Sequence, residues 1–121
     1  MVATVMQAVT GQSFRQAPAT LTGYACYRIK RQVYPGIITD DNSSVNGIIY
    51  YAVDDQSLQR LDEFEADVYE RRKVRVQLPG GDVADAWSYV ISPESVYLLS
   101  DEPWDPANFI QQHLKQYLSR F

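Results

Sequence analysis

Cysteine and histidine are almost absent from this chain, which has one of each, Cys26 and His113. A single cysteine excludes a disulfide within the chain and is typical of proteins kept in a reducing compartment, so we expect a cytoplasmic location. A zinc cluster is excluded and the His-Glu-x-x-His motif is missing, so no metal site is expected. A Ser-His-Asp triad would have to recruit His113, and the Gly-x-Ser-x-Gly turn is missing too.

Several other signals are also missing. No Walker loop and no Gly-x-Gly-x-x-Gly stretch occurs, so we expect no nucleotide cofactor. Basic residues number 11 against 15 acidic ones, and the net charge of −4 argues against a nucleic-acid partner. No apolar run approaches the roughly 20 residues of a membrane span, and the start lacks a secretory pattern. We therefore expect neither a membrane partner nor export.

Local patterns predict a mixture of helices and strands in one domain over residues 1–121, of which 45% are hydrophobic. The predicted helices cover residues 2–10, 55–65 and 106–121, and the predicted strands cover 24–30, 33–38, 45–53, 73–78 and 83–91. Turns are predicted at 40–44 and 79–82. Because residues 45–53 are apolar on both faces, they are typical of a central, covered strand. This order of elements predicts an α+β fold.

The last predicted helix has an apolar stripe that contains the chain's one histidine. Asp105-Pro106 is a good cap and first turn for this helix. His113 falls inside the stripe, where a packing role is the ordinary interpretation. The apolar residues of the stripe are Phe109, Ile110, Leu114, Tyr117, Leu118 and Phe121.

One carboxylate in the middle helix falls where an apolar residue is expected. Leu58, Leu61 and Phe64 recur at helical spacing, and at about 100° per residue Glu65 falls between the first two, on the inward stripe. A carboxylate pointing inward is costly unless it is paired, protonated or facing a polar cavity, so Glu65 is a candidate general acid/base. Alternatively, the helix frays before Glu65 and leaves it in solvent. A lone acid/base suits reactions in which the substrate carries its own nucleophile.

The same region carries a resemblance to a known family. Leu61-Asp62-x-Phe64-Glu65 followed by Tyr69-x-Arg71 resembles the signature of the γ-glutamylcyclotransferase-like superfamily, which includes the plant avirulence-induced-gene group. The resemblance as a whole spans about residues 5 to 118, and further matches occur in the family's order along the chain. They are Leu21-Thr22-Gly23-Tyr24, Tyr34-Pro35-Gly36-Ile37, Val45-Asn46-Gly47-Ile48-Ile49-Tyr50, Trp87-Ser88-Tyr89-Val90 and Trp104-Asp105-Pro106-Ala107-Asn108-Phe109.

This resemblance implies a small mixed β-sheet curled into a partial barrel, with short flanking helices around a polar cavity. It also implies a γ-glutamyl substrate whose own α-amine attacks its γ-carbonyl, so that 5-oxoproline forms and an amine or amino acid leaves. The family's acid/base glutamate matches Glu65. The implied substrate-binding residues are Tyr34, Gly36, Tyr69 and Arg71.

For each of these helper residues a structural role is the alternative. Tyr69 could be a core residue, Arg71 a partner for Asp62 or Glu65, and Pro35-Gly36 a bend in a strand.

The chain departs from the family pattern at its start. Family members begin with a strand and a Tyr-Gly-Ser/Thr-Leu loop, whose amides hold the substrate's α-carboxylate, whereas residues 1–6 resemble the helix that follows. We therefore expect weaker substrate binding and exposed sheet edges that favour a homo-oligomer. The alternative function is a non-catalytic small-molecule binding or interaction domain that retains the cavity.

Overall fold

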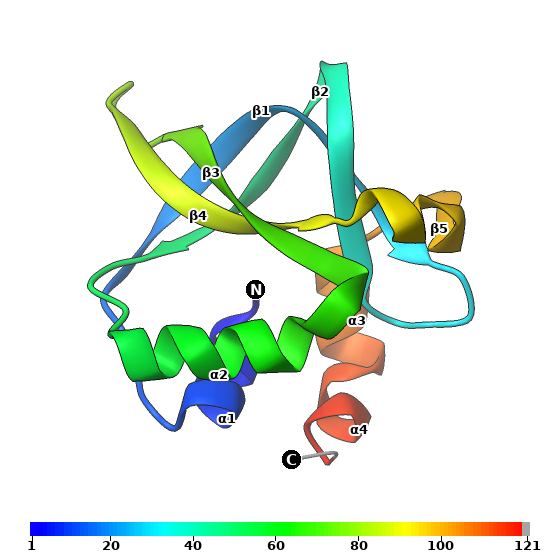
Figure 1. Cartoon of the computed structure of the whole chain (residues 1–121), viewed down its shortest axis with the longest axis horizontal. Coiled ribbons are helices and arrows are strands. Elements are labelled where there is room, and N and C mark those ends of the chain that lie inside the picture. The colour runs from blue at the N-terminus through cyan, green and yellow to red at the C-terminus, as the bar shows by residue number, and fades with distance from the viewer. Residues whose placement is uncertain (120–121) are drawn as a thin grey trace.

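Helices lie on one side of a curled β-sheet (Figure 1). The computed structural model describes residues 1–119. In chain order, the elements are α1 (Ala3–Thr10), β1 (Gln16–Ile29), β2 (Pro35–Tyr50), α2 (Asp55–Glu65), the 3-10 helix η1 (Ala66–Val68), β3 (Tyr69–Gln77), β4 (Val83–Ile91), the 3-10 helix η2 (Pro93–Leu98), β5 (Leu99–Pro103), α3 (Pro106–Gln112) and α4 (Leu114–Leu118). The predicted α+β class is confirmed. Within the described residues, no helix has the length and apolar character needed to cross a membrane.

The sheet is a partial barrel, as expected. Its strands follow the order β2-β1-β3-β4, with β5 also paired to β1, and all these pairings are antiparallel. The β1–β2 and β3–β4 ladders are long, whereas β1 and β3 meet at one position, where Thr20 lies opposite Gln77. The sheet therefore curls over the helices without closing on itself (Figure 1).

Helix α2 lies where the sequence predicts it. The Asp54 carboxylate accepts a hydrogen bond from the Ser57 N–H at 3.1 Å and so caps the N-terminus. Leu61 is buried, and Leu58 and Phe64 are partly buried, so the predicted apolar stripe does face the interior. Helix α1 and the β3–β4 hairpin with its loop at 79–82 are confirmed as well.

The turn predicted at 40–44 is wrong, because these residues lie within β2. They form a bulge between two stretches that pair with β1. The Asp40 carboxylate accepts hydrogen bonds from the Asn42 N–H and the Ser43 hydroxyl, both at 3.0 Å. The side-chain chemistry of a turn is therefore present, but β2 bends there and its pairing with β1 resumes on the other side (Figure 1).

The central strand predicted at 45–53 is also wrong. It is the second half of β2, an edge strand that pairs with β1 alone and leaves Ile48 38% exposed. Strand β1 begins at Gln16, eight residues before its predicted start, where it pairs with Tyr50. The residues at the start of β1 have little strand preference of their own, so the long-range pairing with β2 makes them a strand.

The final helix is broken in two at His113, which is partly buried. Phe109 and Tyr117 are buried as predicted, but Ile110 is 49% exposed and does not belong to the buried stripe. Ile110 follows Phe109 by one residue, and about 100° of rotation turns it toward solvent on a helix this short. The predicted stripe residue Phe121 lies outside the described residues. Neither η2 nor β5 was predicted.

Two apolar clusters stabilise the fold. The first lies among the helices and is built on Val5, Phe109 and Tyr117. The second lies on the inner face of the sheet and is built on Leu21, Val74 and Val76. The first cluster holds the helices together, including the end of α2 through Phe64, and the second holds the β1–β2 and β3–β4 hairpins together.

The packing around Gly36 generates a stability prediction. A Cβ atom at Gly36 would lie 2.9 Å from Leu99 Cδ2 and 3.3 Å from Ile91 Cδ1, whereas one at Gly47, on the same strand, would meet nothing within 4 Å. We expect Gly36→Ala to lower the free energy of unfolding by about 1–2 kcal/mol through overpacking. Gly47→Ala is the matched control and should cause no loss. Urea denaturation of both variants measures the difference, and equal stabilities would contradict this packing.

Candidate functional site

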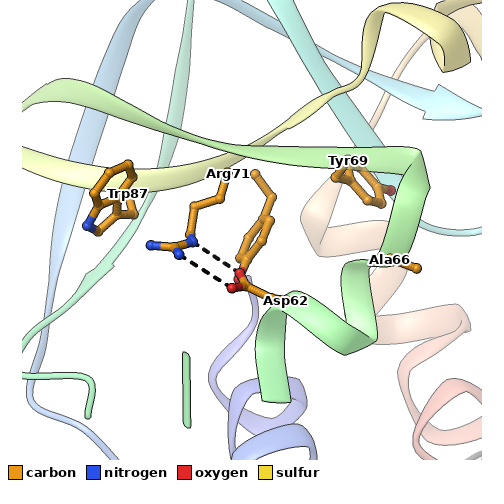
Figure 2. Close-up of a pocket in the computed structure, with 6 residues that line it drawn as sticks. Asp62, Ala66, Tyr69, Arg71 and Trp87 are labelled. Atoms are coloured by element: carbon orange, nitrogen blue, oxygen red, sulfur yellow. Dashed lines mark hydrogen bonds and ion pairs between the residues drawn. The ribbon is translucent and has the colours of Figure 1, made fainter. Parts of the chain in front are cut away.

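A cavity of about 420 Å³ lies between the end of α2 and the β3–β4 hairpin (Figure 2). Two residues predicted to bind substrate, Tyr69 and Arg71, are part of its wall. The lining residues are Asp62, Ala66, Tyr69, Arg71, Trp87 and Tyr89. This volume is within the usual range for small-molecule sites.

Strand alternation brings these side chains together. Tyr69 and Arg71 are two positions apart on β3 and therefore share a face. The antiparallel register places Tyr89 directly opposite Arg71, with Trp87 next to it on the same face of β4. The last turn of α2 lies across the cavity from this face and contributes Asp62.

A polar network occupies the middle of the cavity wall. The Arg71 guanidinium donates to the Asp62 carboxylate from Nε at 3.1 Å and from Nη2 at 3.4 Å, and the Tyr89 hydroxyl donates to the same carboxylate. The Arg71 guanidinium also lies over the Trp87 ring, 4.7 Å from its centroid. The sequence left both Asp62 and Glu65 open as partners for Arg71, and in the structure Arg71 pairs with Asp62.

Glu65 is partly buried at the C-terminal end of α2, and the helix does not fray before it. Burial raises the pKa of its carboxyl from 4.5 to about 7, an effect partly offset by the nearby amino group of Met1. No hydrogen bond or ion pair within residues 1–119 stabilises its charged form. Glu65 is therefore suited to exchange protons near neutral pH.

Glu65 is not among the residues that line the cavity, but its charge reaches two that are. Burial raises the pKa of the Tyr69 hydroxyl above its ordinary value, and the Glu65 charge raises it further. The pKa of Tyr89 is raised by burial first, then by its hydrogen bond to Asp62 and by the charges of Asp62 and Glu65. The Glu65 carboxyl is thus within electrostatic reach of both tyrosines.

The remaining predicted residues, Tyr34 and Gly36, do not line the cavity. Tyr34 packs in the helical core, with its ring centroid 6.2 Å from that of Tyr117. Gly36 is buried, and Leu99 and Ile91 fill the space beside it. Pro35, which lies between the two, accepts a hydrogen bond from the Tyr69 hydroxyl at 2.6 Å through its carbonyl oxygen. The Tyr34–Gly36 segment is therefore connected to the cavity by the hydrogen bond between Pro35 and Tyr69.

Sequence reasoning did not identify Ala66, Trp87 or Tyr89 as site residues, and it considered Asp62 only as a partner for Arg71. The β3–β4 loop could have revealed Trp87 and Tyr89, because its length sets which residues of the hairpin lie opposite one another. Cys26 offers no alternative nucleophile, because burial raises the pKa of its thiol to about 11. Among the described residues, no group of three or more histidine, cysteine, aspartate or glutamate side chains could hold a metal ion.

Comparisons with known proteins agree with this architecture. The sequence matches the family model described as Gamma-glutamyl cyclotransferase, AIG2-like over residues 2–106. AIG2-like protein D from Arabidopsis thaliana is 34% identical over 107 residues, which cover 84% of this chain and 68% of that protein. The solution structure of an Arabidopsis thaliana protein, 26% identical, has a TM-score of 0.73 and covers 100% of this chain and 73% of the other.

A structure of Gamma-glutamyl cyclotransferase has a TM-score of 0.67, with 98% of this chain and 79% of the other covered, and its 15% identity shows the fold alone. The chain spans between 35% and 68% of the length of the curated Arabidopsis relatives that it matches. Because the family model covers most of the residues and the fold agrees, the chain belongs to the Gamma-glutamyl cyclotransferase, AIG2-like family.

Proposed function

We propose that this chain is a γ-glutamyl cyclotransferase-like enzyme that releases 5-oxoproline from a γ-glutamyl amine or amino acid. The α-amine of the substrate attacks its γ-carbonyl carbon, the amide C–N bond breaks, and the leaving nitrogen takes up a proton. Family membership supports this reaction class. The observation that carries the proposal is the burial of Glu65 with no hydrogen bond or ion pair to its carboxyl within residues 1–119, which leaves its pKa at about 7.

Glu65 is the proposed acid/base. A carboxyl group with this pKa is present in both protonation states at neutral pH, as a group that takes and returns a proton in one cycle requires. It would accept a proton from the substrate's α-ammonium and later deliver one to the leaving nitrogen. Since nucleophile and electrophile belong to one molecule, holding the substrate folded supplies much of the acceleration.

Tyr69 and Arg71 are the proposed substrate contacts, because both line the cavity. Tyr34 and Gly36 act indirectly in this proposal, since Pro35 between them positions the Tyr69 hydroxyl. No cofactor takes part in the proposed reaction. A reducing cytoplasm is the proposed location, in keeping with the free Cys26.

The second candidate function is a non-catalytic small-molecule binding domain. The observation that favours it is that Glu65 is not among the residues that line the cavity. Such a domain would bind a γ-glutamyl compound and release it unchanged. Measuring turnover and binding on the same protein separates the two functions.

We expect Glu65→Gln to lower 5-oxoproline release from γ-glutamyl substrates by about 100-fold or more, because Gln cannot transfer the proton. Chromatographic quantification of 5-oxoproline measures this. Glu63→Gln is the matched control, since Glu63 lies on the same helix but is exposed, and it should retain full turnover. Undiminished turnover in Glu65→Gln would remove Glu65 from the mechanism, and binding without turnover in the unchanged chain would support the second function.

The buried carboxyl also predicts a pH dependence of stability. Its pKa is about 7 in the folded chain against 4.5 as an ordinary value, so the folded state binds more protons in this window. The free energy of unfolding should therefore fall as pH rises from 4.5 to 7, by about 2–3 kcal/mol from this group alone. Glu65→Gln should remove that fall and be the more stable protein at pH 8. Urea denaturation at pH 4.5, 6 and 8 tests this, with Glu63→Gln as control, and parallel pH profiles for Glu65→Gln and the unchanged chain would contradict it.

A further inference from the structure

The face of β3 that lines the cavity carries an excess of positive charge. Arg71, Lys73 and Arg75 alternate along the strand and share this face. Arg71 pairs with Asp62, and Arg75 pairs with Asp85 at 3.4 Å. Lys73 has no acidic partner within residues 1–119. One positive charge is thus left uncompensated beside the cavity, and it favours an anionic ligand there.

Arg71 has hydrogen-bond donors left to offer such a ligand. A guanidinium has five N–H groups, and only the Nε and one Nη2 group of Arg71 are used by the Asp62 carboxylate. The other donors have no acceptor among residues 1–119. Asp62 is itself compensated from two sides, because the Tyr89 hydroxyl also donates to it. Asp62 therefore positions the guanidinium and still leaves three of its N–H groups free for a second carboxylate.

Trp87 marks the outer end of this site. Figure 2 shows Trp87 and Tyr69 at opposite ends of the cavity, with the Arg71 side chain between them. The tryptophan is 58% exposed, which is unusual for so large an apolar side chain, whereas Tyr69 is anchored to the inner carbonyl of Pro35. The inner end is also the one that the Glu65 charge reaches.

We propose that Arg71, supported by Lys73, binds a carboxylate on the leaving group, so that the preferred substrates are γ-glutamyl amino acids rather than uncharged γ-glutamylamines. This assignment rests on the proposed cyclotransferase function. The γ-glutamyl head lies toward Tyr69 and Glu65, and the leaving amino acid extends toward Arg71, where its side chain contacts the Trp87 ring. Cleavage of γ-glutamylalanine breaks the amide C–N bond, forms the ring C–N bond, and releases alanine with its carboxylate unchanged.

The test compares two probes that differ only in this carboxylate, γ-L-glutamyl-L-alanine and its C-terminal amide. We expect kcat/KM for 5-oxoproline release to be at least about tenfold higher for the acid, as one charge-assisted contact would give. Arg71→Gln should bring the ratio of the two values close to one. Arg75→Gln, on the same face but outside the cavity, is the matched control and should keep the ratio.

Arg71→Gln removes the cation that pairs with Asp62, so a misfolded variant would also lose the preference for the acid. A second variant, Lys73→Gln, avoids this ambiguity. Lys73→Gln does not touch the Asp62 network, and we expect it to lower the ratio about two- to threefold at low ionic strength and not at high salt. A ratio near one in the unchanged chain, or a ratio insensitive to Arg71→Gln in a folded variant, would overturn the carboxylate site.

Calorimetric titration of the Glu65→Gln variant with both probes separates this proposal from the cyclotransferase function. Turnover of both probes with equal kcat/KM retains the function and removes the carboxylate site. Tighter binding of the acid without any 5-oxoproline release from the unchanged chain retains the site and removes the function. If neither probe binds or is turned over, both the carboxylate site and the cyclotransferase function are overturned.

Discussion

The site depends on the abrupt reversal of the chain between α2 and β3. At this junction Ala66 has φ 53° and ψ −149°, a conformation that costs a residue with a side chain roughly 1–3 kcal/mol. The N–H of Ala66 still donates to the Asp62 carbonyl, and the buried Ser92 hydroxyl donates to the carbonyls of Asp67 and Val68 at 3.0 and 3.1 Å. These bonds hold the reversal in place, and the last turn of α2 consequently lies against the strand that follows it.

Two carboxylates three positions apart on α2 illustrate how this arrangement divides the chemistry. Asp62 faces the cavity, where a guanidinium and a phenol compensate its charge. Glu65 does not line the cavity, and burial that the Met1 amino group only partly offsets favours its neutral form. The same functional group is thus a fixed anchor at one position and a proton carrier at the other, which is a common way to assign roles in acid/base sites.

The sequence predicts the elements whose signals are local. The capped helix α2, the helix α1 closed by Gly11 and the strand β4 with its preceding Pro79–Asp82 loop are recovered with nearly the right limits, whereas β3 begins four residues before its predicted start. The strand β1 and the bulged strand β2 are not, because the start of β1 and the end of β2 depend on pairing with each other across 34 positions, from Gln16 to Tyr50. Periodicity finds the inward direction of Glu65, and motif resemblance finds Tyr69 and Arg71. Neither could show that Leu99 would occupy the space beside Gly36, since that contact joins residues 63 positions apart.

Apart from β5, which pairs with β1, the sheet consists of two hairpins that pair with each other at one position. The β1–β2 and β3–β4 ladders are each extensive, and between β1 and β3 only Thr20 and Gln77 pair. Backbone pairing at that single position does little to fix the angle between the hairpins, so the polar bonds from Arg71 and Tyr89 to Asp62 on α2 take on part of that task. A ligand carboxylate that drew the guanidinium away from Asp62 would therefore loosen the β3–β4 hairpin against α2, while both ladders stayed intact.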